Sequence, residues 1–583
     1  MDVFNFPKQW LLVCLTIGLI SHYFASGRTE KLDKDKFSLF INVLLCAIAI
    51  CMGISALISN TTFVRSMFGY PGRANGVLTY ICILSIVWVA SRTLLMHDFQ
   101  HKFQNRLNIL FLVFGLYSTL QVLNLDPVSW NNPYNRVIGT LGNPNFSGAF
   151  LGVASAVISC AALNSRRRIR WIYAAFAIWL LGLAISTQSI QAVGIFIIGM
   201  LLQIMIIVYK RFSPKLFLSF LFIFVAIASF FAIGLLGYGP FGEKLYQYTL
   251  RLRLEYWRIG LETARDFPFT GKGPDSYIEG FRLYRGSEFV GKYSQEVISD
   301  SAHNVLINFM ANYGIPAFIL LSVLIGAISW KSIKLLFSKK TVPTGTTMLA
   351  MIWILMLTQS LFSLEQIGLN IFQWVCGALV LNKGIYDSTS AEKRVISTSR
   401  QANLNFIQGL RTEISILAIV LSMITGWSFM RQENSLLRLA SIPQGFRLSD
   451  ADFQNYLRGL NFFSKDEIRR AIYISDFYLK TDKYMESKLL MEEVIKRDPE
   501  AAEAFELLAR LARNGKDLNL ELNYRKEIER IDPFNYENLL SIAHSSLEIS
   551  NSSEAISYAK KVLSMSTDKT INESATAILR NSK

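Results

Sequence analysis

The chain has 583 residues, of which 51% are hydrophobic and 17% are charged. A soluble fold could not bury so much apolar surface, and many apolar runs of membrane length indicate an integral membrane protein. The formal charge of +16 could suggest a nucleic-acid-binding protein. However, the part after Arg431 is nearly neutral overall, so the excess lies in short loops between the apolar runs, where it is typical of membrane topology. We therefore expect no nucleic-acid partner.

Apolar runs of roughly 17–25 residues predict about twelve membrane-spanning helices. In chain order they fall near residues 9–26, 38–59, 75–95, 107–125, 146–164, 171–187, 189–208, 215–236, 306–330, 346–363, 366–382 and 411–430. A polar interval over about 237–304 interrupts this series and is much longer than an ordinary connection between helices, which indicates a functional loop. The sequence thus predicts an all-α, polytopic membrane domain over residues 1–430.

The distribution of Lys and Arg in short loops predicts the orientation of these spans. One set of alternate loops is basic and is expected to be cytoplasmic: 28–36, 92–106, 166–170, 210–215, 331–340 and 383–394. The other set contains few basic residues and includes the loops 126–145, 187–189 and 363–366. The long interval and the C-terminal part follow this second set, so both are expected to face outward.

Beyond the last span the composition changes to that of a charged helical domain. We expect a linker over 431–462 and helical repeats over 463–583, because Asp498-Pro499 recurs as Asp532-Pro533 after 34 residues, the tetratricopeptide period. Small residues that would let paired helices approach closely recur in the same register: Ser475, Ala509 and Ala543. The pattern predicts an α-solenoid of about three tetratricopeptide-like helix pairs that binds a protein partner, with a plain helical bundle as the alternative.

Two residues of the polar interval are candidates for chemistry. His303 stands where the interval enters the next span, close to Asp300, and a titratable group at such a boundary is suited to act as a general base or charge partner. Arg253 lies in the segment RLRLEYWR, where basic and aromatic residues, including Trp257, recur at helical spacing. A guanidinium can donate two hydrogen bonds to a phosphate at once. The alternative for His303 is a histidine that lies at the membrane interface and takes no part in a reaction. The alternative for Arg253 is a basic helix face that is simply exposed to solvent.

The outward loop before the span at 146–164 contains a second group of polar residues. Its Asn-Pro-Asn sequence at 143–145 predicts a turn followed by a helix start, with Asn145 as the cap. A metal site is not expected. His97 and His101 have a suitable spacing for a pair of ligands, but they lie in a loop predicted to be cytoplasmic and lack a third ligand.

Three groups of residues follow one another along the membrane half: GTLGNPN at 139–145, then Arg253-x3-Trp257 with PFTGKGPD at 268–275, and finally Ala302-His303-Asn304 with Tyr313-Gly314-Ile315-Pro316. In this order and at these loop positions they resemble the O-antigen ligase family. That family also includes bacterial O-oligosaccharyltransferases and related polymerases of lipid-linked glycans. The resemblance covers the membrane half and is firmest over about 133–316.

The resemblance implies a GT-C-like helical fold and a transferase in the bacterial cytoplasmic membrane. Such enzymes move a glycan from undecaprenyl diphosphate to an acceptor at the outer face, without a metal, a nucleotide sugar or another cofactor. By this resemblance His303 is the essential loop histidine, Arg253 binds the diphosphate, and Arg136 is a weaker candidate for the same role. The remaining residues expected at the substrate are Asn143, Asn145, Trp257, Asp275, Asn304 and Gln191.

One position departs from the family pattern. Family members commonly carry Ser-Arg-Gly-Ala at the outer end of a span, whereas this chain has Ser189-Ile190-Gln191-Ala192, with Ile190 in place of the arginine. A second contact to the diphosphate is therefore in question. A polymerase of lipid-linked repeat units and a non-catalytic scaffold for envelope polysaccharide assembly stay open as alternatives, and the acceptor is a glycan, a lipid or a protein.

Overall fold

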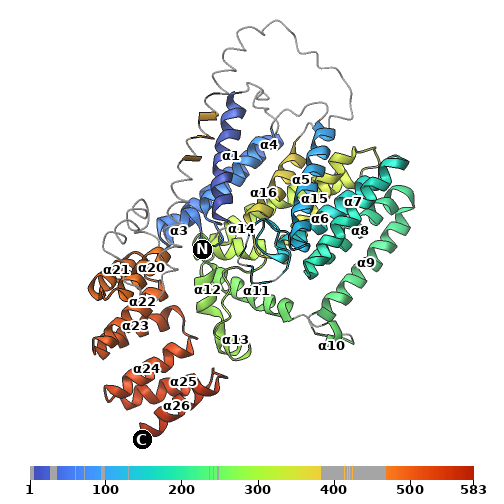
Figure 1. Cartoon of the computed structure of the whole chain (residues 1–583). Coiled ribbons are helices and arrows are strands. Elements are labelled where there is room, and N and C mark those ends of the chain that lie inside the picture. Colours follow the sequence, from blue (N-terminus) through green and yellow to red (C-terminus); the bar gives the residue numbers. More distant parts are fainter. Residues whose placement is uncertain are drawn as a thin grey trace.

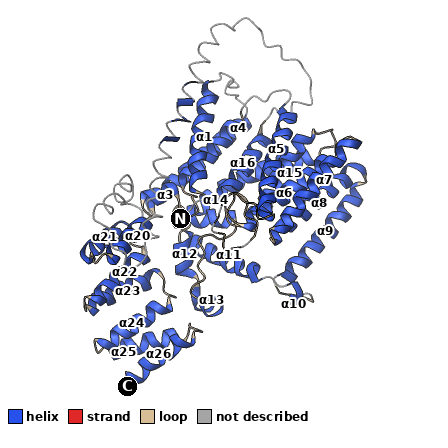
Figure 2. Ribbon diagram, in the orientation of Figure 1, coloured by secondary structure: helices blue, strands red, loops and turns tan. Residues whose placement is uncertain are grey.

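The computed structural model describes most of the chain, and every regular element in the described part is a helix (Figure 2). The described residues are 5–25, 36–59, 61–70, 72–92, 99–128, 130, 132–134, 136–235, 237–240, 242–245, 248–382, a few positions between 413 and 424, and 468–582. The linker expected at 431–462 lies outside them, as does most of the span expected at 411–430. Within these ranges the all-α prediction is confirmed.

The helices form three groups along the chain (Figure 1). The first part of the membrane half contains α1 (Phe6–Ala25), α2 (Lys36–Ile58), α3 (Phe63–Phe68), α4 (Val77–Ala90), α5 (Phe99–Val122), α6 (Pro144–Leu163), α7 (Arg167–Ser186), α8 (Ile190–Arg211) and α9 (Pro214–Leu235). The polar interval folds into α10 (Gly242–Leu245), α11 (Tyr248–Asp266), α12 (Tyr277–Tyr284) and α13 (Gly286–Tyr293), after which the membrane half resumes with α14 (Val305–Leu336), α15 (Thr344–Ser360) and α16 (Ile367–Leu381). The C-terminal group is α20 (Ile468–Lys480), α21 (Tyr484–Arg497), α22 (Ala502–Asn514), α23 (Leu518–Ile531), α24 (Tyr536–Glu548), α25 (Ser552–Leu563) and α26 (Lys569–Asn581).

Every expected span up to residue 382 coincides with one of these helices. Among the described residues, five helices are long and apolar enough to cross a membrane, namely α2, α6, α7, α8 and α14, and three further apolar segments are shorter. The chain is therefore a multi-pass helical membrane protein, while the expected count of about twelve spans stays a prediction.

Helix α6 forms the centre of the membrane half, because nearly all of its side chains are buried against α7, α8 and α15. Small residues permit this packing. A Cβ atom at Gly199 of α8 would lie 2.5 Å from the Cβ of Ala156, and one at Gly152 would collide with the backbone of Ala192. Close approach of backbones through small residues is the usual way in which helices associate in lipid.

The C-terminal helices pack against the helices of the polar interval (Figure 1). One continuous apolar core contains Phe289 and Tyr293 of α13 together with Leu522 of α23 and Leu539 of α24. Because the two groups share a core, they lie on the same side of the membrane. The loop charges also predict that the polar interval and the C-terminal helices face the same side, which is consistent with this contact.

Within the C-terminal group, consecutive helices pack in pairs as the repeat pattern predicts. The small residues expected between paired helices, Ser475, Ala509 and Ala543, are all fully buried. This burial explains the residue type at these positions, because a larger side chain would separate the two helices. The assignment to tetratricopeptide-like repeats itself stays a prediction.

Candidate functional site

Helix α11 brings Arg253 to the surface of the polar interval. Tyr256 and Ile259 are buried in the part of α11 that packs against α12 and α14. This packing fixes the rotation of the helix about its axis and therefore the direction of Arg253. The Arg253 side chain is partly buried, and among the described residues it has no hydrogen bond and no ion pair. The neighbouring Trp257 ring lies 5.9 Å from the ring of Phe362, and its indole N–H is buried without an acceptor in the described structure.

His303 occupies a constrained turn directly before α14. Its φ of +53° is uncommon for a residue with a side chain, so the surrounding contacts must impose it. The backbone N–H of His303 donates to the hydroxyl of Ser301, and the N–H of Ala302 donates to Oδ1 of Asn308. Asn304 caps α14, because its side chain accepts from the N–H groups of Leu306 and Ile307 in the first turn. Asn304 thus orients the His303 turn.

The imidazole of His303 lies beside the ring of Tyr256, with 5.3 Å between ring centroids. Its Nδ1 atom is buried and has no hydrogen-bond partner in the described part of the chain. Burial and the positive charges of Arg253 and Arg73 lower the pKa of His303 to about 3, against a smaller opposite effect of Asp300. The imidazole is therefore neutral at physiological pH and can accept a proton.

Arg73 is a site residue that the sequence reasoning missed. It comes from the loop between α3 and α4, and its Nε and Nη2 atoms donate to the two carboxylate oxygens of Asp300 at 2.7 and 2.8 Å. Asp300 therefore pairs with Arg73, although it precedes His303 by only three residues. The one available signal was an arginine in a loop that the alternation of the spans predicts to face outward, where basic residues are rare.

Asp275 lies beneath the Arg73 loop. Its side chain is 3% exposed, and Oδ2 accepts a hydrogen bond from the backbone N–H of Tyr70. Burial raises the pKa of Asp275 to about 7. Gln9 of α1 holds the same loop from another side by donating to the carbonyl groups of Phe68 and Ala74. Asp275, expected at the substrate, thus fixes the segment that carries Arg73.

The second and third sequence motifs meet at a kink in α14. The N–H of Lys272 donates to the carbonyl of Ala311 at 2.9 Å, and the N–H of Ile315 donates to the carbonyl of Pro268 at 2.7 Å. Gly314 makes the kink with a φ of +83°, and a Cβ atom there would lie 2.5 Å from the carbonyl carbon of Phe269. The glycine is required both by conformation and by space.

The buried side chain of Glu365 supports the His303 turn through Asn308. Glu365, in the loop between α15 and α16, accepts from Tyr80 at 2.7 Å and from Asn370 at 3.1 Å. Burial raises its pKa, while hydrogen bonds from Tyr80, Asn370 and Asn308 act in the opposite direction. Asn308 therefore joins Glu365 to the backbone of Ala302. Sequence patterns give no sign of this contact, because its members come from distant segments.

The residues of the first motif lie at the start of α6. The expected cap Asn145 is wrong: Asn143 is the cap, and its side chain accepts from the N–H of Asn145 at 2.8 Å because Pro144 begins the helix. Asn145 accepts instead from the hydroxyl of Ser189 at 2.8 Å. Within the described structure, no hydrogen bond, ion pair or ring contact joins these residues to His303.

The other expected contacts are also separate from the His303 turn. Arg136 has an exposed side chain in the loop before α6. Gln191 lies in the first turn of α8, and its Oε1 atom is buried without a partner among the described residues. Ile190, where the resemblance led us to expect an arginine, begins α8 and is 64% exposed.

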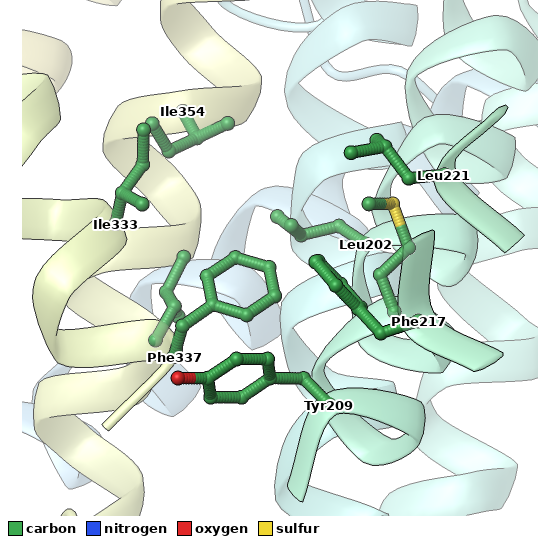
Figure 3. Close-up of a pocket in the computed structure, with 9 residues that line it drawn as sticks. Leu202, Tyr209, Phe217, Leu221, Ile333, Phe337 and Ile354 are labelled. Atoms are coloured by element: carbon green, nitrogen blue, oxygen red, sulfur yellow. The ribbon is translucent and has the colours of Figure 1, made fainter. Parts of the chain in front are cut away.

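An apolar pocket of about 500 Å³ lies among α8, α9, α14 and α15 (Figure 3). Its lining includes Leu202, Phe217, Ile333 and Phe337. Ile333 and Phe337 are at the C-terminal end of α14, whereas His303 precedes the N-terminal end of that helix. The pocket has no charged lining residue, so it is unsuited to bind a phosphate and is distinct from the site at His303.

Residues 176–322 match the family model described as O-antigen ligase. This segment contains Arg253, Trp257, Asp275 and His303 and ends within α14, so the resemblance read from the motifs is confirmed for this part of the chain. Arg73 and the C-terminal helices lie outside the match. No curated protein matches the chain. The matched segment and the membrane-spanning helices support a multi-pass membrane enzyme of the ligase or polymerase kind that acts on glycans.

Proposed function

We propose that this protein is a membrane glycan transferase that moves an oligosaccharide or polysaccharide from undecaprenyl diphosphate to an acceptor. The observation that carries this proposal is that the imidazole of His303 lies beside Tyr256, which follows Arg253 by one turn of α11, and that the described structure gives Arg253 no hydrogen bond or ion pair. His303 and Arg253 both lie inside the segment that matches the O-antigen ligase family, whose members use lipid-linked glycan donors.

The reaction divides naturally between these two side chains. The acceptor hydroxyl attacks the anomeric carbon of the donor sugar, and the bond between that carbon and the diphosphate oxygen breaks. The leaving diphosphate takes the electron pair, and Arg253 stabilises its increased negative charge. His303 accepts the hydroxyl proton through Nδ1, and the bound diphosphate makes the imidazole a stronger base by raising its pKa.

The proposed location is the outer face of the bacterial cytoplasmic membrane. The charge pattern of the short loops supports an outward position for the polar interval. The shared core between α13 and α24 supports the same side for the C-terminal helices. We interpret these helices as tetratricopeptide-like repeats that contribute to the transferase from outside the membrane.

The test is to replace His303 and Arg253 by alanine and to measure glycan transfer in membranes that contain equal amounts of each variant. Both replacements should reduce transfer by about a hundredfold or more, since one general base or one anion-stabilising group contributes on this scale. Arg265→Ala is the matched control, because Arg265 is an exposed arginine of the same helix, paired with Asp266. Full transfer by both site variants would refute the proposal and favour a scaffold.

A polymerase of lipid-linked repeat units is the second candidate, because the matched family includes both reactions. The same two side chains would serve it, with a lipid-linked glycan as the acceptor. Product length decides between the two: a ligase transfers a preformed chain once, whereas a polymerase gives a ladder of chains on the lipid carrier. Loss of the ladder in His303→Ala would assign polymerisation.

A further inference from the structure

The site contains a cation that the matched segment does not include. Arg73 lies outside residues 176–322 and reaches the His303 turn through its bidentate ion pair with Asp300. At the position where the family commonly has a second arginine, this chain has the exposed Ile190. The site thus gains a guanidinium from a different element.

The loop that carries Arg73 is built to hold a fixed conformation. Gly72 and Ala74 on either side of Arg73 have φ values of +93° and +57°. For a residue with a side chain, such as Ala74, this conformation persists only where neighbouring contacts impose it. Those contacts come from the buried side chains of Gln9 and Asp275, which bind the backbone of the loop on two sides.

The pair with Asp300 orients the guanidinium toward the same turn that presents His303. Both side chains of the pair are 22% exposed, so a ligand can reach them. The positive charge of Arg73 reaches the imidazole, because it contributes with Arg253 to the low pKa of His303. A held arginine needs little rearrangement when an anion binds, which favours affinity.

We propose that Arg73 is the second cation of the diphosphate site and binds the lipid-linked diphosphate together with Arg253. This inference rests on the proposed function. It assigns to Arg73 the second positive contact to the diphosphate, which Ile190 cannot supply because it has no charge. Two cations match a diphosphate better than a monophosphate, because each phosphate group can lie beside a separate positive charge. Arg73 therefore sets the preference for diphosphate over monophosphate.

The experiment uses the full-length protein in detergent and measures the binding of farnesyl diphosphate, farnesyl monophosphate and inorganic pyrophosphate. Arg73→Gln should weaken binding of farnesyl diphosphate by about tenfold or more, and Arg253→Gln should do the same, since each removes hydrogen bonds to a charged group. Binding of the monophosphate should change much less in Arg73→Gln. Arg265→Gln, with an equal loss of charge on α11, should leave all three affinities unchanged.

The outcomes separate this inference from the proposed function. If Arg253→Gln weakens diphosphate binding and Arg73→Gln does not, the role of Arg73 is refuted while the proposed function stands. If neither change matters, the proposed function fails as well.

Arg73→Lys guards against a folding defect. It keeps the charge and a partner for Asp300, but the loss of the planar guanidinium should reduce the preference for diphosphate over monophosphate. Equal loss of both ligands in Arg73→Lys would refute a specific role. Stronger binding of pyrophosphate than of farnesyl diphosphate would indicate that the natural ligand is a soluble anion and no lipid, and would also contradict the inference.

Discussion

The guanidinium of Arg285 donates to both carboxylate oxygens of Asp532 at 2.9 Å, and this ion pair joins the polar interval to the C-terminal helices. The two side chains are only 1% and 6% exposed. A second nitrogen of Arg285 donates to the carbonyl of Gln295 at 2.6 Å. The other aspartate of the repeated Asp-Pro pair, Asp498, lies 4.0 Å from Arg65 of α3. The two aspartates of the Asp-Pro pair, 34 residues apart, thus both contact arginines outside the C-terminal helices.

The first prediction concerns this ion pair. Asp532→Ala leaves the buried Arg285 without its partner, and breaking a buried pair in this way typically costs about 3–5 kcal/mol. We expect the C-terminal helices to detach from α13, which hydrogen exchange would detect as faster exchange of the amides of Gly286–Tyr293. Glycan transfer should also fall, since Tyr256 beside His303 belongs to the same apolar core.

A charge swap and a surface pair provide the controls. Arg285→Asp combined with Asp532→Arg should restore part of the protection, because attraction is re-established across the contact. Glu493→Ala breaks an exposed pair with Arg497 inside the C-terminal helices and should change neither exchange in α13 nor transfer. Unchanged exchange in Asp532→Ala would show that the apolar core alone holds the two groups together.

The second prediction concerns the protonation of His303. Because its folded pKa of about 3 lies below the ordinary value near 6.5, unfolding takes up a proton between these two values. The contribution of the neutral imidazole to stability is complete above pH 6.5 and is lost as the pH falls toward 3. Carbon-13 NMR of labelled histidine, assigned among the five histidines by comparison with His303→Gln, should show no titration of His303 between pH 7 and about pH 5.

Variants test the cause of this shift. Arg253→Gln removes one of the charges that lower the pKa and should move the titration upward, whereas Arg265→Gln should leave it in place. Addition of farnesyl diphosphate should raise the pKa, since a bound anion stabilises the imidazolium. Titration of His303 near 6.5 in the unmodified protein would contradict the buried position of the ring.

Sequence patterns predicted the elements of this site better than its contacts. Hydropathy predicted the positions of the helices in the membrane half up to residue 382, because each needs a long apolar run. The motifs pointed to the segments that carry His303, Arg253 and Gly314. They did not predict Arg73 or Glu365, because these residues approach the site from segments far away in the chain. A short motif cannot distinguish a residue that touches a ligand from one that holds the loop beneath it, as Asp275 does.

The third prediction tests the support of the His303 turn. Asn308→Leu removes the acceptor of the Ala302 N–H and leaves Glu365 with fewer donors. Transfer should fall by about tenfold, in line with the loss of one or two buried hydrogen bonds, while His303 and Arg253 are both retained. Ser329→Ala is the matched control: Ser329 is also on α14, and its replacement removes the acceptor of the Trp353 indole N–H, so transfer should stay unchanged. A normal rate in Asn308→Leu would exclude a positioning role.

The last prediction concerns the kink in α14. Gly314→Ala places a Cβ atom 2.5 Å from the carbonyl carbon of Phe269, in a conformation that is unfavourable for alanine. The loop from Pro268 must move, and because Asp275 ends this loop, the contact that orders the Arg73 segment moves with it. We expect a thermal unfolding midpoint several degrees lower, together with weaker diphosphate binding. Gly326→Ala is on the same helix, and its new Cβ atom would meet no side chain or other segment within 4 Å, so this change should be neutral or slightly stabilising. Equal behaviour of the two variants would mean that the kink does not determine the geometry of the site.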